Sequence, residues 1–294
     1  MNRLRIGLVG TGPWASATHA PALARHPGVD LSGVWGRRPE AAATLAGAHK
    51  TTAYTDVDEL FAASDAVAFA VPPDVQAPLA ARAAAAGCHL LLDKPVATTV
   101  DGARDLAAAV ERAGVASVVF FTLRFASETS AWLSEQVSTG GWFTGRADWY
   151  GSFYGPDGTE AFSSPWRASR GGLWDVGPHA LSMLMPVLGD VSAVTAAPGP
   201  GDTAHLILRH TGGASSTATL SLTAPAKCAG LTVELRGESG TVVLPTWEPG
   251  EAFRTAVDEL VESAGSGTAH PCDVRFGLRV TEILAQAEEH ITAA

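Results

Sequence analysis

The chain is predicted to be an α/β protein with a doubly wound parallel sheet first and an α+β domain with an open, mainly antiparallel sheet second. Three observations favour this fold class. Short apolar runs alternate with alanine-rich helical runs through the first 120 residues, as in parallel sheets covered by helices. A glycine-rich turn joins the first apolar run to the first helical run. Beyond Thr122, the apolar runs are longer, and Gly and Pro-Gly turns separate them.

The N-terminal elements are expected to follow one another in a regular order. The apolar runs predict strands at 4–9, 29–35, 65–71, 88–92 and 116–121. The alanine-rich runs between them predict helices at 15–25, 39–46, 75–86 and 100–112. These strands are apolar throughout, which is typical of parallel strands buried on both faces. We therefore predict a first domain at residues 1–122.

The second domain is predicted at residues 123–294. The sequence indicates a helix at 127–138, strands at 145–153, 191–197, 204–210, 214–222 and 231–236, and a further helix at 274–290. A very apolar helix is expected at 178–188, and Pro186 should end or kink it near Met185. An antiparallel sheet of this kind leaves one face exposed, so we expect a homodimer or homotetramer formed through that face.

The composition argues against several classes of protein. The 294 residues are 46% hydrophobic and 17% charged, which suits one large or two modest cores. A net charge of −10 without a basic stripe argues against nucleic-acid and membrane partners. No apolar run reaches the ~18 residues that cross a bilayer. The three cysteines show no metal-binding spacing, and no signal peptide is visible, so we expect reduced core thiols, no metal and a cytoplasmic location.

The glycine turn has the pattern of a dinucleotide-binding site. Residues 10–15 read Gly-Thr-Gly-Pro-Trp-Ala and fit G-x-G-x-x-A. The first glycine makes the turn, the second lets the backbone approach a pyrophosphate, and the small third residue lets helix pack on strand. Because a strand precedes the turn and a helix follows it, we expect a Rossmann-type domain. The residues of the turn expected at the cofactor are Gly10, Thr11, Gly12, Pro13 and Trp14.

The residues that follow the second strand favour NADP as the cofactor over NAD. An NAD-binding carboxylate usually follows the end of this strand, whereas Asp30 lies at its start. Arg37 and Arg38 occupy the expected place, and two guanidinium groups suit a 2′-phosphate. The two arginines could also be solvated loop residues, so NAD stays the other candidate.

Two further strings complete a family pattern. The first is Asp93-Lys94-Pro95, and the second, from Gly171 to His179, reads Gly-Gly-Leu-Trp-Asp-Val-Gly-Pro-His. With the glycine turn, and in this order, they resemble the Gfo/Idh/MocA oxidoreductases, the group of glucose–fructose oxidoreductase and inositol dehydrogenase. The resemblance covers almost the whole chain. It implies hydride transfer between NAD(P) and a carbinol or ketone carbon of a sugar, polyol or related ring.

The resemblance also implies roles for three residues. Lys94, Asp175 and His179 would meet beside the nicotinamide, with a sharp turn and a cis peptide at Lys94–Pro95. His179 would be the general acid/base, Lys94 would stabilise the developing alkoxide, and Asp175 would orient one of them. The chemistry needs such groups, because a hydride leaves carbon as its hydroxyl loses a proton. Each residue also has a structural interpretation: a surface lysine, a helix N-cap and a core histidine.

The chain departs from the family pattern at several positions. Where the family commonly has T-P-N-x-x-H, residues 71–76 read Val-Pro-Pro-Asp-Val-Gln. Val71 and Pro72 are expected at the cofactor by position. Because Gln76 replaces the histidine, the sequence does not determine which residues contact the edge of the cofactor. Ser182 stands where a carboxylate usually follows His179 by three residues.

Candidates for substrate contacts lie at two places. Trp166 and Arg167 immediately precede the double glycine in an aromatic-rich stretch, and Arg124 follows the last predicted parallel strand. Aromatic side chains suit the apolar faces of sugar rings. Two other functions stay open: a non-catalytic nucleotide-binding regulator, and a lyase or hydrolase that uses tightly bound NAD as a transient oxidant. The presence of Lys94, Asp175 and His179 argues against the regulator.

Overall fold

The computed structural model describes residues 3–154 and 164–293. By packing, the chain forms two compact units. The first comprises the residues up to Phe120 together with Gly250–Arg279, and the second comprises Phe121–Pro249 together with the residues from Val280. The predicted domains, 1–122 and 123–294, differ from these units at residues 121–122 and in the segment 250–279. This segment packs with the first unit because one of its helices contacts two strands there.

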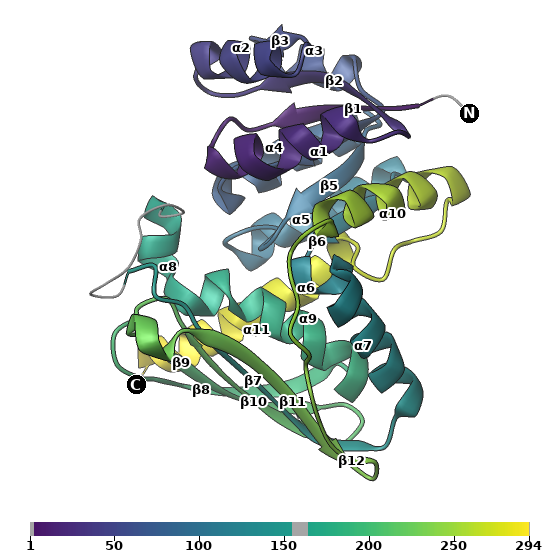
Figure 1. The fold of residues 1–294 in the computed structure, drawn as a ribbon. Coiled ribbons are helices and arrows are strands. Elements are labelled where there is room, and N and C mark those ends of the chain that lie inside the picture. The colour runs from purple at the N-terminus through teal and green to yellow at the C-terminus, as the bar shows by residue number, and fades with distance from the viewer. Residues whose placement is uncertain (1–2, 155–163, 294) are drawn as a thin grey trace. The chain divides into compact units, whose positions relative to one another are not determined.

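The first unit contains a six-stranded sheet with the order β3-β2-β1-β4-β5-β6, and every neighbouring pair is parallel (Figure 1). Its strands are β1 Leu4–Val9, β2 Val29–Trp35, β3 Ala53–Tyr54, β4 Ala66–Phe69, β5 His89–Asp93 and β6 Ser117–Phe120. Every residue of β4 and β6 is buried, which is expected for strands covered on both faces. The sequence therefore predicts this parallel sheet correctly.

Helices cover both faces of this sheet. They are α1 Ala20–Arg25, α2 Pro39–Ala48, α3 Val57–Ala62, α4 Pro73–Ala85, α5 Val100–Ala113 and α10 Ala252–Ser266. Helix α4 packs on α5, and α1 packs on α10, which also contacts β5 and β6. The strand order reverses between β1 and β4, so right-handed crossovers place these two pairs on opposite faces. The predicted helix at 15–25 begins with a π-helical turn, Ala15–His19.

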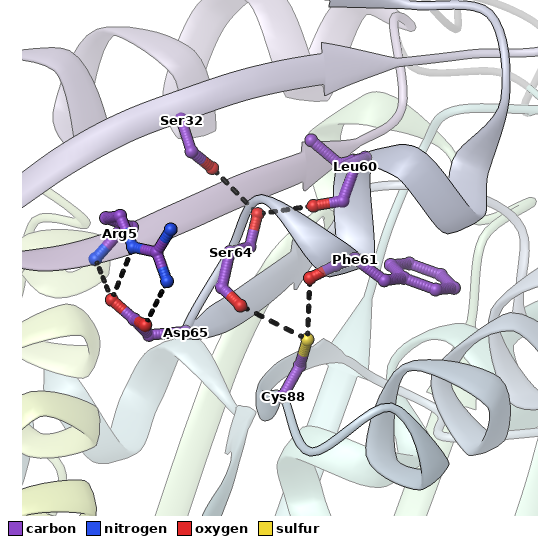
Figure 2. A network of polar contacts seen from close by, with 7 residues as sticks. All are labelled: Arg5, Ser32, Leu60, Phe61, Ser64, Asp65 and Cys88. Carbon is purple, nitrogen blue, oxygen red and sulfur yellow. Dashed lines mark hydrogen bonds and ion pairs between the residues drawn. The ribbon is translucent and has the colours of Figure 1, made fainter.

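A polar network ties the amino-terminal parts of strands of this sheet together (Figure 2). The Arg5 guanidinium donates to both carboxylate oxygens of Asp65, at 2.6 and 3.1 Å. The Cys88 thiol donates to the Phe61 carbonyl at 3.4 Å, and burial raises the pKa of this thiol to about 11. Cys88 and Cys272 are buried as predicted, but Cys228 is exposed because it lies in a short 3-10 turn, Ala226–Cys228, outside the core.

The second unit contains a mixed, mainly antiparallel sheet with the order β12-β11-β7-β10-β9-β8 (Figure 1). Its strands are β7 Trp142–Tyr150, β8 Val191–Pro198, β9 Ala204–His210, β10 Ser215–Ser221, β11 Gly230–Gly237 and β12 Gly240–Val243. Only β7 and β10 pair in parallel. Residues of β9 alternate between buried and exposed, so one face is covered and the other is open, as predicted.

The helices of the second part of the chain are α6 Thr122–Phe125, α7 Ser127–Thr139, α8 Pro165–Asp175, α9 Gly177–Leu188 and α11 Val274–Ala293. Helix α9 contacts β7 and β10 on the covered face of the second sheet. No helix within the described ranges is both long and apolar enough to cross a membrane.

The sequence predicted that Pro186 ends or kinks this helix near Met185. The structure shows that Pro186 does not end α9, which continues to Leu188. Proline lacks the N–H that would bond the carbonyl four residues earlier, which is that of Ser182. Arg124 on α6 donates to this carbonyl instead, through Nη1 at 3.2 Å. A side chain from a neighbouring helix thus satisfies the acceptor that Pro186 leaves open.

Candidate functional site

A pocket of about 480 Å³ lies at the carboxyl ends of β1, β2 and β4. This is where the strand order of the first sheet reverses, the usual ligand position in such folds. The pocket is lined by Gly10, Thr11, Gly12, Trp35, Gly36, Arg37, Arg38, Ala70, Val71 and Pro72. Seven of the residues predicted at the cofactor are therefore together in one pocket of the first unit.

The glycines of the turn have distinct roles. Gly10 has a φ of +136°, and a Cβ on it would lie 2.4 Å from the Ala70 carbonyl oxygen. This position needs glycine for the backbone to turn beside β4. A Cβ on Gly12 would meet no atom within 4 Å. The open side of Gly12 is the space that a pyrophosphate requires, so the residues present fit a dinucleotide.

Pro13 and Trp14 are in the first turn after the glycines and do not line this pocket. The Trp14 ring contacts His19 edge-on, with centroids 6.2 Å apart, and His19 contacts Phe253 of α10 at 4.1 Å. Burial lowers the pKa of His19 to about 3. These aromatic contacts hold the π-helical turn that follows the glycines.

The side of the pocket formed by the end of β2 is basic. Arg37 and Arg38 are both exposed there, and Arg38 precedes α2 as its N-cap residue. Asp30 lies at the other end of β2, where it forms an ion pair with Arg3 at 2.8 Å. Among the described residues, the pocket lining includes no carboxylate.

Lys94 follows β5 in a loop of the first unit, and the Lys94–Pro95 peptide is cis. The Lys94 amide donates to Asp93 Oδ1 at 2.8 Å. The fully buried Gln76 of α4 bonds to the backbone on both sides of the lysine. Gln76 is therefore placed at the lysine loop rather than in the lining of the dinucleotide pocket.

The double glycine forms a kink at the middle of α8 in the second unit. Gly171 has a φ of +63°, and a Cβ on Gly172 would lie 2.6 Å from Ser221 Cα at the end of β10. The Gly172 amide donates to Asp202 Oδ2 at 2.7 Å. The two glycines thus let the backbone turn and approach β10 before it reaches Asp175.

Asp202 is the centre of a hydrogen-bond network that the sequence analysis missed. Its carboxylate also accepts from the hydroxyls of Ser221 and Thr223, each at 2.7 Å, and from the amides of Leu222 and Thr223. Burial alone raises the pKa of Asp202, but the bonds from Thr223, Ser221 and the amides lower it by more, so the pKa lies below its usual value. The sequence showed only a Pro-Gly-Asp turn, with no local sign of these partners.

Asp175 is the last residue of α8 and is buried. Arg167 Nε lies 3.0 Å from Asp175 Oδ1, and the same guanidinium lies over the Trp166 ring, 4.8 Å from its centroid. Arg167 thus contacts both Asp175 and Trp166, and substrate contact by Trp166 and Arg167 stays a prediction.

His179 is buried in the first turn of α9, with Pro178 before it as expected. Its ring stacks on Trp149 of β7, with centroids 5.0 Å apart and planes at 26°. Asp175 and His179 lie on different helices, because Asp175 ends α8 and α9 starts at Gly177. Val176 is the N-cap of α9, and no side chain caps it.

The predicted residues are thus gathered in two places. Lys94 and the dinucleotide pocket belong to the first unit, and Asp175, His179 and Arg124 belong to the second. Within the described parts of the chain, no group of three or more His, Cys, Asp or Glu side chains is arranged to hold a metal.

Two family models match the chain. One, described as an oxidoreductase family with an NAD-binding Rossmann fold, covers residues 4–121, and the other, the Gfo/Idh/MocA C-terminal domain, covers residues 142–243. The chain belongs to the Gfo/Idh/MocA oxidoreductases. Membership in this family confirms the resemblance and the fold predicted from the sequence.

Two curated relatives match part of the chain. The uncharacterized oxidoreductase YdgJ of Escherichia coli (strain K12) is 27% identical over 197 residues, which are 64% of this chain and 54% of YdgJ. The D-glucoside 3-dehydrogenase of the same organism is 28% identical over 205 residues, 63% of this chain and 54% of that protein. The match therefore spans about half the length of these relatives.

Solved structures resemble the whole chain. The crystal structure of GenD2 from gentamicin A biosynthesis, in complex with NAD, is 25% identical with a TM-score of 0.83. The match covers 99% of this chain and 95% of GenD2. GenD2, which was solved with NAD bound, thus shares the fold of this chain.

Proposed function

We propose that this protein is an NAD(P)-dependent dehydrogenase or reductase acting on a CH–OH group of a sugar, polyol or related ring. The observation that carries the proposal is the pocket at the switch point of the parallel sheet, where Gly12 leaves room for a pyrophosphate. The D-glucoside 3-dehydrogenase relative supports a sugar-like substrate.

In this proposal, Lys94, Asp175 and His179 are the residues that act on the reacting carbinol. When bound, the nicotinamide supplies the hydride acceptor for oxidation and the donor for reduction. During oxidation, the proton of the substrate hydroxyl passes to His179 as the C–H hydride leaves, and the alkoxide becomes a ketone. The Lys94 ammonium stabilises the negative charge that develops on the oxygen.

The surroundings of His179 and Asp175 suit these roles. Trp149 stacks on the imidazole and restricts its rotation. Arg167 pairs with Asp175, so this carboxylate is held in one orientation rather than solvated. Arg124, Trp166 and Arg167 are proposed to contact the sugar, with Arg124 also bonded to the Ser182 carbonyl.

We further propose NADP as the preferred cofactor. The argument is electrostatic: two exposed arginines and no described carboxylate adjoin the end of β2 in the pocket. Together with Gly10, Thr11, Gly12, Val71 and Pro72, they would hold the adenosine and pyrophosphate parts of the cofactor.

The test is a turnover screen of sugars, glucosides and polyols with NAD⁺ and NADP⁺, followed by absorbance of the reduced nicotinamide. Steady oxidation of one compound, lost in His179→Ala and Lys94→Ala, is the expected result. A cofactor that copurifies, does not exchange and supports elimination or hydrolysis without net redox change would indicate the transient-oxidant enzyme instead. Binding of NAD(P) without turnover of any compound would indicate the regulator.

The open face of the second sheet is proposed as the subunit interface. One row of side chains crosses all six strands in register: Thr195, Ile207, Thr217, Arg146, Glu234 and Val243. Ile207 and Val243 are more than half exposed, and Arg146 lies 3.8 Å from Glu234. A second copy would cover these apolar side chains and place oppositely charged groups in reach of each other. The cytoplasmic location stays a prediction.

A further inference from the structure

We propose that Gln76 is a positioning residue that sets the orientation of Lys94, an inference that rests on the role given to Lys94 above. Gln76 lies in the first turn of α4 and has no solvent-exposed surface. Its whole amide is turned toward the segment 93–96, which carries the lysine. A buried amide must be fully hydrogen-bonded to be tolerated, so its partners define its role.

The amide bonds to the lysine loop through both of its ends. Gln76 Nε2 donates to the carbonyls of Asp93 at 2.8 Å, Pro95 at 3.3 Å and Val96 at 3.3 Å. Gln76 Oε1 accepts from the Asp93 amide at 2.8 Å. Nε2 has two hydrogens, so one of them is shared between two carbonyls. One side chain therefore fixes backbone groups before and after Lys94.

The loop is also fixed by packing on its apolar side. A Cβ on Gly277 of α11 would lie 2.5 Å from Val96 Cγ1, so this glycine lets the buried Val96 approach the helix closely. With Val96 packed and the backbone at Asp93 and Pro95 bonded to Gln76, the Lys94 side chain leaves from a fixed point. The direction of the ammonium then depends on bonds that only an amide supplies here.

Three substitutions separate the parts of this role. Gln76→Met keeps the length and volume of the side chain but removes all four hydrogen bonds. Gln76→Glu keeps an acceptor for the Asp93 amide but removes the donors and brings a carboxylate toward three carbonyls. Gln76→Asn keeps the amide on a shorter side chain. If Gln76→Met does not fold, the measurements are made on Gln76→Asn instead.

Ser64→Ala is the matched control. Ser64 is also buried in the first unit, and its hydroxyl donates to the Leu60 carbonyl at 2.7 Å. It lies just before the amino end of β4, whereas the lysine loop follows the carboxyl end of β5. Its loss removes a buried bond to the backbone far from residues 93–96.

The first readout needs no substrate. The chain has three lysines, Lys50, Lys94 and Lys227, so reductive ¹³C-methylation gives three lysine signals in an NMR spectrum. The Lys94 signal is the one that disappears in Lys94→Arg. Gln76→Met and Gln76→Glu should shift or broaden this signal and leave those of the exposed Lys50 and Lys227 unchanged. An unchanged Lys94 signal in a folded Gln76 variant overturns the inference.

The second readout is a double-mutant cycle in turnover, with the compound that the screen identifies. Misplacement of a catalytic group by about 1 Å lowers the rate on the order of 100-fold. Gln76→Met should lower kcat to a comparable extent and have no further effect when Lys94 is already Ala. Additive effects would overturn the inference. If Lys94→Ala leaves kcat unchanged, the role of Lys94 in the proposed function fails, whereas the NMR result still decides whether Gln76 positions the side chain.

Discussion

Asp202 stabilises the double-glycine kink with a single carboxylate. It accepts from the amides of Gly172, Leu222 and Thr223, and from two hydroxyls. Asp202→Ala leaves buried donors without an acceptor, and each such group costs about 1–3 kcal/mol. We expect the free energy of unfolding to fall by about 3 kcal/mol or more in chemical denaturation, and the turnover to fall with it because the kink leads into Asp175.

Asp190→Ala is the control for this substitution, since Asp190 accepts from the Val191 amide in the same unit. It should destabilise the protein less. Equal losses for the two variants would contradict a special role of Asp202.

The lowered pKa of Asp202 also predicts a dependence of stability on pH. Its pKa lies below the unfolded value of about 3.9, so between the two values the unfolded chain binds more protons than the native one. The contribution of Asp202 is then complete above the unfolded pKa and is lost as the pH falls through the folded pKa. Thermal unfolding from pH 6 to pH 2 should show a smaller loss of Tm on acidification in Asp202→Asn than in wild type. A parallel decline would assign the acid sensitivity to other carboxylates.

Arg37 and Arg38 are predicted to select the cofactor. Their joint replacement by Ala removes two charge-assisted contacts to a 2′-phosphate, so the affinity for NADPH should fall on the order of tenfold or more. The affinity for NADH should stay unchanged in the same titration of protein fluorescence. Arg104→Ala with Arg112→Ala is the control, because it removes the same charge from α5 of the same unit. A preference of the wild type for NADH would contradict the prediction.

At the scale of elements, one glycine of the turn is needed for folding and the other for dinucleotide binding. Gly10 has a positive φ that other residues rarely adopt, and a Cβ on it would lie 2.4 Å from the Ala70 carbonyl oxygen. A Cβ on Gly12 would meet no atom within 4 Å. Gly10→Ala should therefore destabilise the protein by about 2 kcal/mol or more. Gly12→Ala should leave its unfolding unchanged but weaken dinucleotide binding at least about tenfold. Calorimetric titration and denaturation of both variants measure the two effects, and unchanged binding by Gly12→Ala would contradict the assignment of the pocket.

The elements that local patterns describe well were predicted, and those that depend on distant contacts were not. The apolar runs at 4–9 and 29–35 coincide with β1 and β2, because short apolar runs between helices are typical of strands in a parallel sheet. Strand β3 has two residues and α3 has six, too few to show a periodicity.

Helix α10 was missed although its sequence carries a signal. Ala252, Phe253, Ala256, Val257 and Leu260 are buried at helical spacing, which is the pattern of an amphipathic helix. By contrast, no local pattern predicts α8, because its double glycine indicates a loop. The backbone there is held by Asp202, 30 residues away in the sequence.

The sequence motifs indicate candidate site residues but not the contacts that support them. Motifs place the glycine turn, Lys94 and His179, because chemistry demands those side chains. The partners Gln76, Trp149 and Arg167 follow from packing, and one of them, Gln76, was visible only as a departure from the family pattern.

At the scale of the whole molecule, the open sheet face predicts self-association. Ile207 lies on β9, next to the edge strand β8 in the row that crosses all six strands, and is 56% exposed. In a dimer formed through this face, Ile207→Lys would bury a charge in the interface with the second copy. A buried charge without a partner disfavours association. Light scattering should give a dimer or tetramer for the wild type and a monomer for this variant.

Val137→Lys is the matched control, because Val137 is 49% exposed on α7 of the same unit and lies off the sheet. It should keep the wild-type mass. A wild type that is monomeric, or an Ile207→Lys variant that keeps its assembly, would show that this face is not the interface.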